Sequence, residues 1–462
     1  MDEARRGGRR PRPGLKLLLF LHASLFLNVF FFCYLVLSRH QPPPGWARSA
    51  ARDAEAVAAI DCSGHGRAFP AGGGLPACEC NACYSGDDCS RLLLDCPADA
   101  GSEDPLFLEP YWQQHASTSS IVLPGWQCMS SPTMGGDFIS AELDRHVRLL
   151  HRAAENAITD GKFILFGSEV AELLHALVHA LSADNASSSP ACLVASAPHN
   201  PVSILQFNSF GRRQHECIGI RSNYVKGSVS PATKIIEYVT SPNDPDGLLQ
   251  QSVLGGSAVI HDHAYYWPHY SSIPAPADED IMLFTISKIS GHAGIRLWWA
   301  VIKDQKTYQK AAEYMSLNTM VVSCDVQLRV VKLIRVVIAE MGKGGDIFEF
   351  GYRTLKTRWS KLHKLISSSN RFSIQPLLPR HCNYFKKIRD PSPAYAWLKC
   401  DVEEDKDCYA VLKKSGITSR SGELFEANSH YTRLSLVKTE DDFDLLTMRM
   451  EALVSKESIA SS

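Results

Sequence analysis

The sequence predicts an α/β protein whose main sheet is mostly parallel. Short apolar runs of strand length alternate along the chain with stretches in which apolar residues recur at helical spacing. Strands separated by helices are typical of parallel sheets, because two parallel strands need a long crossover connection. The chain has 462 residues, enough for more than one domain. Its net charge of −1 and the lack of dense basic clusters in its body argue against a nucleic-acid partner.

The N-terminus predicts a transmembrane signal anchor. Residues 17–37 are 21 uncharged, largely apolar residues, enough to cross about 30 Å of hydrocarbon. The alternative is a cleaved signal peptide, but the apolar part of such a peptide is only about 7–15 residues long. Residues 1–16 carry six basic side chains and should stay cytosolic. The rest of the chain is then expected in the lumen of an endomembrane compartment, with the endoplasmic reticulum as first choice.

Two segments follow the anchor. Residues 38–55 are rich in Pro and Ala and are expected to be a linker. Residues 56–96 hold six of the 14 cysteines, which is typical of a disulfide-stapled module in an oxidising compartment. Zinc is the alternative, since Cys80 and Cys83 have ligand spacing, but no second such pair follows. The sequon at Asn185 could be glycosylated only in the lumen.

From residue 97 onward the elements of the sheet can be placed. The predicted strands are 163–166, 192–196, 235–239, 258–260, 281–284 and 297–302, and the predicted helices are 171–183 and 304–340. Ligands bind beyond the carboxyl ends of parallel strands. We therefore expect the polar residues after these strands to lie along one edge: Asp244, Asp262, Tyr265 and Lys288.

Lys288 gives the first indication of chemistry. A lysine at the end of a buried strand is costly unless it has a function. One established function is a Schiff base to pyridoxal phosphate, with nearby hydroxyls and an arginine holding the phosphate. Thr285, Ser287 and Arg296 supply such groups close by. The alternative is a surface lysine whose charged end reaches water.

Together these residues resemble the plant alliinase and tryptophan aminotransferase-related family, which belongs to the fold-type I aminotransferases. The similar segments are 62–68, 78–84, 124–127, 241–243, 287–288, 291–294 and 432–436. The resemblance implies an EGF-like module at 56–96. It also implies an aminotransferase-like domain at 97–460, with a large domain around a mostly parallel sheet and a smaller α/β C-terminal domain. A homodimer and four disulfides are implied as well: Cys62–Cys78, Cys80–Cys89, Cys83–Cys96 and Cys400–Cys408.

The resemblance implies roles for the residues at the sheet edge. Lys288 would bind pyridoxal 5'-phosphate and then shuttle the α-proton of the substrate. Asp262 would pair with the ring nitrogen, so that the ring can accept electrons. Tyr265 would donate to the phenolic oxygen of the ring, next to Asp244.

Phosphate and substrate binding are implied for a second set of residues. The phosphate would contact Ser168, Thr285, Ser287 and Arg296, the arginine being suited to it by a planar and permanently charged fork. Arg433 would bind the substrate carboxylate. No metal site is implied.

The implied reaction is transfer of the amino group of L-tryptophan to a 2-oxo acid, giving indole-3-pyruvate for auxin biosynthesis. A second enzymatic interpretation is an alliinase-type carbon–sulfur lyase, which shares the early steps but eliminates a β-substituent. The third is a non-catalytic relative that uses the module or the pocket for binding.

The third interpretation rests on four departures from the family pattern. The loop 167–171 has lost two hydroxyl donors, and Glu169 places a carboxylate at a helix N-terminus where a phosphate should lie. Residues 197–201, with His199 and Asn200, stand where the family has tyrosines that stack on the ring, and His199 would stack there less well. Asp244 replaces an asparagine donor, and a carboxylate cannot donate unless it is protonated. Trp298 replaces a small glycine. These changes predict weakened cofactor binding.

Overall fold

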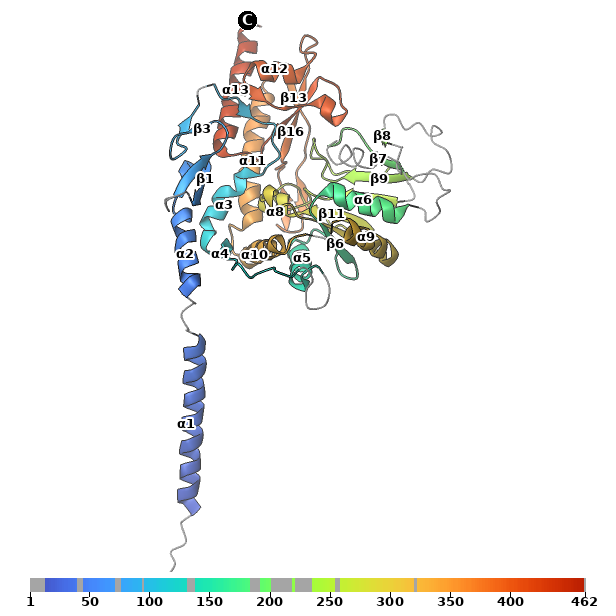
Figure 1. Cartoon of the computed structure of the whole chain (residues 1–462). Helices are drawn as coiled ribbons and strands as arrows, with labels where there is room; N and C mark the ends of the chain where they lie inside the picture. Colours follow the sequence, from blue (N-terminus) through green and yellow to red (C-terminus); the bar gives the residue numbers. More distant parts are fainter. Residues whose placement is uncertain are drawn as a thin grey trace, which may run out of the picture. The chain divides into compact units, whose positions relative to one another are not determined.

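The chain divides into two compact units, Met1–Leu92 and Leu93–Ser462 (Figure 1). The computed structural model describes residues 13–39, 45–70, 76–93, 95–130, 138–182, 192–200, 218–220, 235–253, 258–319 and 322–460. The sequon at Asn185 lies outside the described residues.

The N-terminal unit begins with two helices, α1 (Pro13–Arg39) and α2 (Gly45–Ala58). The predicted span 17–37 lies within α1. Among the described residues, no helix was found that is long and apolar enough to cross a membrane. The anchor stays a prediction. Helix α2 lies where a linker was expected, because this segment is rich in Ala and Arg, two strong helix formers.

The cysteine module consists of short elements held by disulfides. These are η1 (Cys62–Gly64), β1 (Gly66–Pro70), β2 (Pro76–Cys80), β3 (Tyr84–Ser85) and β4 (Arg91–Leu92), with β1 antiparallel to β2 and β3 antiparallel to β4. The predicted bridges Cys62–Cys78 and Cys80–Cys89 are confirmed, which excludes Cys80 as a zinc ligand. Cys83 and Cys96 are also disulfide-bonded, and their pairing with each other stays a prediction.

The C-terminal unit is built around a sheet with the strand order β6-β12-β11-β10-β9-β7-β8 in the described part of the chain. The strands are β6 (Phe163–Gly167), β7 (Cys192–Ala195), β8 (Ile218–Ile220), β9 (Ile235–Thr240), β10 (Ala258–Asp262), β11 (Ile281–Thr285) and β12 (Trp298–Ile302). Every strand predicted from the sequence is present, and β8 is additional. The strands from β11 to β8 are parallel, as expected, whereas β12 runs antiparallel to both neighbours.

Helices cover both faces of this sheet, because its strands are apolar on both sides. Alternate residues of β11 enter two hydrophobic clusters: Ile281 and Leu283 join one, and Met282 and Phe284 join the other. The helices that complete the clusters are α6 (Val170–Leu181) and α9 (Gln305–Asn318) for the first, and α5 (Ala141–Ala154) and α10 (Cys324–Glu340) for the second.

The single helix predicted over 304–340 is wrong, since the structure has the two helices α9 and α10. The side chain of Ser323 accepts a hydrogen bond from the backbone N–H of Val326 and so caps the start of a new helix. Cys324, the next residue, forms a disulfide with Cys128 that was not predicted. The continuous apolar pattern therefore belongs to two separate helices.

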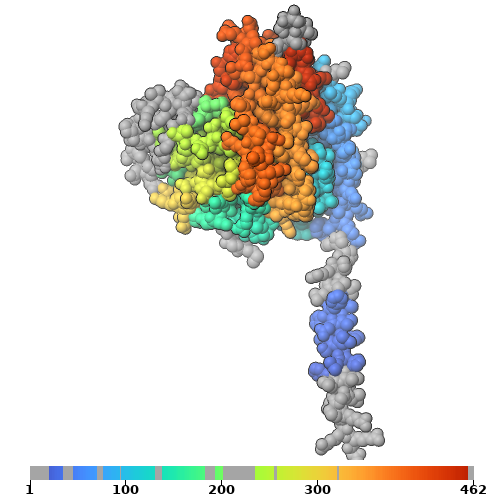
Figure 2. Space-filling model, turned by 180° about the vertical axis from the view of Figure 1, so that it is seen from behind, coloured from blue at the N-terminus to red at the C-terminus, as the bar shows by residue number. Residues whose placement is uncertain are grey.

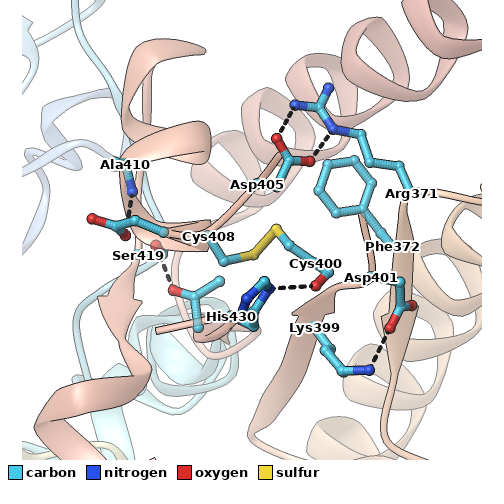
Figure 3. Close-up of a disulfide and its surroundings, with 12 residues drawn as sticks. Arg371, Phe372, Lys399, Cys400, Asp401, Asp405, Cys408, Ala410, Ser419 and His430 are labelled. Atoms are coloured by element: carbon cyan, nitrogen blue, oxygen red, sulfur yellow. Dashed lines mark hydrogen bonds and ion pairs between the residues drawn. A yellow bond between two sulfur atoms is a disulfide. The ribbon is translucent and has the colours of Figure 1, made fainter. Parts of the chain in front are cut away.

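A smaller antiparallel sheet follows, with the order β13-β16-β19-β18, and matches the predicted C-terminal α/β part. Its strands are β13 (Phe372–Ile374), β16 (Tyr395–Cys400), β18 (Arg420–Ser421) and β19 (Tyr431–Ser435), and the helices near it are α11 (Ile347–Ile366), α12 (Cys408–Lys414) and α13 (Glu440–Ala460). Much of this part is seen in orange beside the yellow-green surface in Figure 2. The predicted bridge Cys400–Cys408 is confirmed and joins the end of β16 to the start of α12 (Figure 3).

Several short elements connect these layers. They are β5 (Ala98–Asp99), η2 (Leu106–Leu108), α3 (Glu109–Gln114), α4 (Ala116–Ser119), α8 (Ile286–Ser290), η4 (Ala293–Ile295), β14 (Arg380–Cys382), β15 (Lys387–Arg389), β17 (Ile417–Thr418) and η5 (Gly422–Phe425).

Candidate functional site

A cavity of about 180 Å³ lies at the carboxyl ends of β9, β10 and β11. Six of the residues predicted for the site line it: Asp244, Asp262, Tyr265, Ser287, Lys288 and Arg296. The sheet edge therefore gathers these side chains as the sequence predicts. The other three predicted site residues are not among the lining residues: Ser168, Thr285 and Arg433.

Lys288 is positioned by a one-turn helix, α8, that begins directly after β11. Thr285 caps this helix, since its hydroxyl oxygen accepts from the backbone N–H of Ser287 at 3.2 Å. The Lys288 Nζ donates to the backbone carbonyl oxygen of Glu103 at 3.0 Å and lies 5.0 Å from the centroid of the Tyr265 ring. Burial lowers the pKa of Lys288. The amine is therefore closer to the neutral form that attacks a carbonyl carbon.

Asp262 ends β10 as a buried carboxylate. It accepts a hydrogen bond of 2.5 Å from the Tyr238 hydroxyl and one of 2.9 Å from the backbone N–H of Ala264. Burial raises the pKa of Asp262, and the hydrogen bond from Tyr238 opposes that rise. A carboxylate in this state favours a cationic partner such as a protonated ring nitrogen.

Tyr265 is tied to the smaller sheet. Its hydroxyl forms a short hydrogen bond with the hydroxyl of Tyr395 in β16, and burial raises the pKa of Tyr265 well above its usual value. The sequence gives no indication of Tyr395, because the two tyrosines are separated by 130 residues.

Arg433 lies behind the cavity wall. Its Nη1 donates to Asp244 at 2.7 and 2.9 Å and to Glu103 at 3.1 Å, and its guanidinium carbon lies 3.9 Å from the centroid of the Tyr395 ring. Asp244 and Glu103 line the cavity, as does Asn200, which donates to both of them. The predicted substrate arginine therefore faces carboxylates of its own chain.

Glu103 is the main site residue that the sequence analysis missed. Its carboxylate also accepts from Arg420 Nη1 at 2.6 Å. Burial alone would raise the pKa of Glu103, but the charges of Arg433, Lys288 and Arg420 lower it to about 2. Glu103 lies in a loop after β5 with no motif around it, so only the tertiary structure reveals its role.

Arg296 is likewise paired within the chain. Its Nε donates to Glu169 Oε1 at 2.5 Å, its Nη2 donates to the same oxygen, and its Nη1 donates to the carbonyl oxygen of Ala293 at 2.8 Å. The backbone N–H and the hydroxyl of Ser168 both donate to Glu172 Oε2 at 2.7 Å. Two of the four donors predicted to hold a phosphate, Ser168 and Arg296, therefore contact carboxylates, whereas the Thr285 hydroxyl donates to Ser287 and to the carbonyl oxygen of Leu297.

The remaining departures differ in their consequences. Trp298 lines the cavity beside Arg296. His199 is not among the lining residues; it is buried, its Nδ1 lies 3.7 Å from Glu426 Oε2, and burial lowers the pKa of His199 to about 4. The stacking role considered for His199 is therefore not seen.

The cavity fits pyridoxal phosphate by the chemistry of its donors. Its lining combines a buried amine (Lys288), a buried carboxylate that favours a cation (Asp262), and an arginine (Arg296). The last of these, Arg296, is partly exposed and can exchange its partner for a phosphate.

Comparisons with known proteins give consistent matches. Residues 98–454 match the family model "Allinase", and residues 45–96 match the "Alliinase EGF-like domain". Tryptophan aminotransferase-related protein 3 of Arabidopsis thaliana is 46% identical over 450 residues, covering 96% of this chain and 98% of that protein. An alliin lyase of Allium cepa var. aggregatum is 46% identical over 424 residues, covering 88% and 94%. The structure of an aminotransferase from Staphylococcus aureus superposes with a TM-score of 0.55 at 14% identity, covering 78% and 94%, and shows the shared fold.

Proposed function

Since this chain belongs to the alliinase family, we propose that it is a pyridoxal-phosphate-dependent enzyme acting on an amino acid. One observation carries the proposal. Lys288, Asp262 and Arg296 line a single cavity at the carboxyl edge of the sheet.

Each residue has a defined task in this proposal. The cofactor, when bound, supplies an electron sink for a carbanion at the substrate α-carbon. Lys288 binds it covalently through Nζ and then moves the proton at that carbon. Asp262 holds the ring nitrogen in its protonated form, Tyr265 orients the ring, and Ser287 and Arg296 hold the phosphate.

The finer proposal is transamination of L-tryptophan with a 2-oxo acid, to give indole-3-pyruvate for auxin biosynthesis. The match to tryptophan aminotransferase-related protein 3 supports this proposal, because the alignment covers 98% of the length of that protein. A carbon–sulfur lyase is the second candidate, because an alliin lyase is equally identical at 46%. Purified protein given L-tryptophan and a 2-oxo acid, or alliin alone, separates the two: indole-3-pyruvate indicates transamination, whereas pyruvate from alliin indicates β-elimination.

The cofactor itself is tested by absorption spectroscopy of the protein after incubation with pyridoxal phosphate. We expect a visible band that Lys288→Ala abolishes and that Lys303→Ala, a change at an exposed lysine, leaves intact. A folded protein without any lysine-dependent band would contradict the proposal.

We also propose that the chain is anchored in a membrane with its C-terminal unit in the lumen, and that it forms a homodimer. Alkaline extraction of membranes, with and without residues 1–37, tests the anchor. Light scattering of the purified protein tests the dimer.

A further inference from the structure

We propose that Glu169 is a specificity-determining residue of the cofactor site, which disfavours a phosphate group at Arg296 and so weakens the preference for phosphorylated over unphosphorylated pyridoxal. The inference rests on the proposed function, because it assigns Arg296 to the cofactor phosphate.

The geometry shows an arginine whose nitrogens are all engaged. Nε and Nη2 of Arg296 donate to one carboxylate oxygen of Glu169, and Nη1 donates to the carbonyl oxygen of Ala293. Glu169, Ala293 and Arg296 all line the cavity. The Glu169 carboxylate thus already makes the contacts that a phosphate would make there.

A second carboxylate removes the neighbouring donors. Glu172 Oε2 accepts from both the backbone N–H and the hydroxyl of Ser168, at 2.7 Å each. Glu169 occupies the N-cap position of α6 without a side-chain capping hydrogen bond, and Glu172 lies in the first turn. Both negative charges therefore lie where the helix end would otherwise attract an anion. An arriving phosphate dianion must compete with these carboxylates and is repelled by them.

A competing anion can break the contact between Glu169 and Arg296, because this ion pair is not deeply buried. The side chains of Arg296 and Glu169 are 48% and 36% exposed, and exposed pairs contribute little to stability. A phosphate can therefore displace Glu169 from Arg296, but at a loss of affinity. Pyridoxal, which has a hydroxyl in place of the phosphate, does not meet this charge repulsion.

The test compares the dissociation constants of pyridoxal phosphate and pyridoxal for the full chain and for Glu169→Gln, measured by absorbance and fluorescence titration. We expect Glu169→Gln to tighten binding of pyridoxal phosphate about tenfold, equivalent to about 1.4 kcal/mol, and to leave pyridoxal unchanged. Glu403→Gln, at an exposed glutamate between β16 and α12, is the matched control. Thermal unfolding confirms that the variants remain folded.

The inference is overturned if the full chain and Glu169→Gln bind pyridoxal phosphate equally. It is also overturned if Glu169→Gln binds pyridoxal phosphate and pyridoxal more tightly by the same factor. The same titrations in a Lys288→Ala background separate it from the proposed function, since they record non-covalent binding only. A gain for the phosphorylated ligand there, without any lysine-dependent absorption band in the parent chain, supports the role of Glu169 and overturns the proposed function. A lysine-dependent band without that gain supports the proposed function and overturns the role of Glu169.

Discussion

Arg433 donates from a single nitrogen, Nη1, to both carboxylate oxygens of Asp244, at 2.7 and 2.9 Å. Its Nη2 donates to the carbonyl oxygen of Gly101 at 3.2 Å, and its Nε is buried without a hydrogen-bond partner among the described residues. The guanidinium group is therefore committed to carboxylates of its own chain behind the cavity wall, and its buried Nε does not face the cavity.

Arg433→Met should lower the free energy of unfolding by about 3–5 kcal/mol, because it leaves the buried Asp244 without its countercharge. Denaturant unfolding measures the loss. In the double variant with Asp244→Asn, the loss should be smaller than the sum of the two single losses, since the unpaired charge is gone. Strictly additive losses would show that the two side chains are not coupled.

Glu103 should make stability depend on acid pH. The pKa of Glu103 is lowered from 4.5 to about 2 in the folded protein, despite the opposing effect of burial. A lowered pKa means that Glu103 stabilises the fold above pH 4.5, and that this contribution is lost as the pH falls from 4.5 toward 2. The stability difference between the parent chain and Glu103→Gln should shrink over that window. If the free energies of unfolding of the two proteins ran parallel from pH 6 to about pH 2, the lowered pKa of Glu103 would be contradicted.

Tyr238→Phe should move the acid limit of cofactor binding to higher pH. The Tyr238 hydroxyl stabilises the ionised form of Asp262, whose pKa burial already raises. Removing a hydrogen bond to a charged group costs about 1.5–3 kcal/mol, which corresponds to a rise of about one to two pKa units. Titrations of pyridoxal phosphate at decreasing pH measure the midpoint, and an unchanged midpoint would argue against a role of ionised Asp262.

The bridge Cys128–Cys324 should stabilise the fold more than the bridge Cys400–Cys408. It closes a sequence separation of 196 residues, whereas Cys400–Cys408 closes 8. Loop-closure entropy predicts losses of up to about 5 kcal/mol for the double serine variant at Cys128 and Cys324, and about 2.5 kcal/mol for that at Cys400 and Cys408. Chemical unfolding without reductant measures both, and a reversed order would contradict the entropic account.

Local sequence accounts for the parts of the site that lie close together along the chain. The apolar run of β11, the capping Thr285 and Lys288 are contiguous, so their pattern predicts strand, turn and buried amine together. Tyr395 is separated by 130 residues from Tyr265, its partner in the site. Glu103 is separated by 185 residues from Lys288. No local pattern therefore identifies either residue. The antiparallel direction of β12 was missed for the same reason, since a strand's direction depends on the connections around it.

The acceptor of the Lys288 amine is a main-chain carbonyl, that of Glu103, and this limits what amino-acid replacement can reveal. Every residue at position 103 carries the same carbonyl, so a scan of side chains would alter the charge near the amine and leave this hydrogen bond in place. Only a change of the chain's path between β5 and η2, or replacement of the peptide bond by an ester, would probe it.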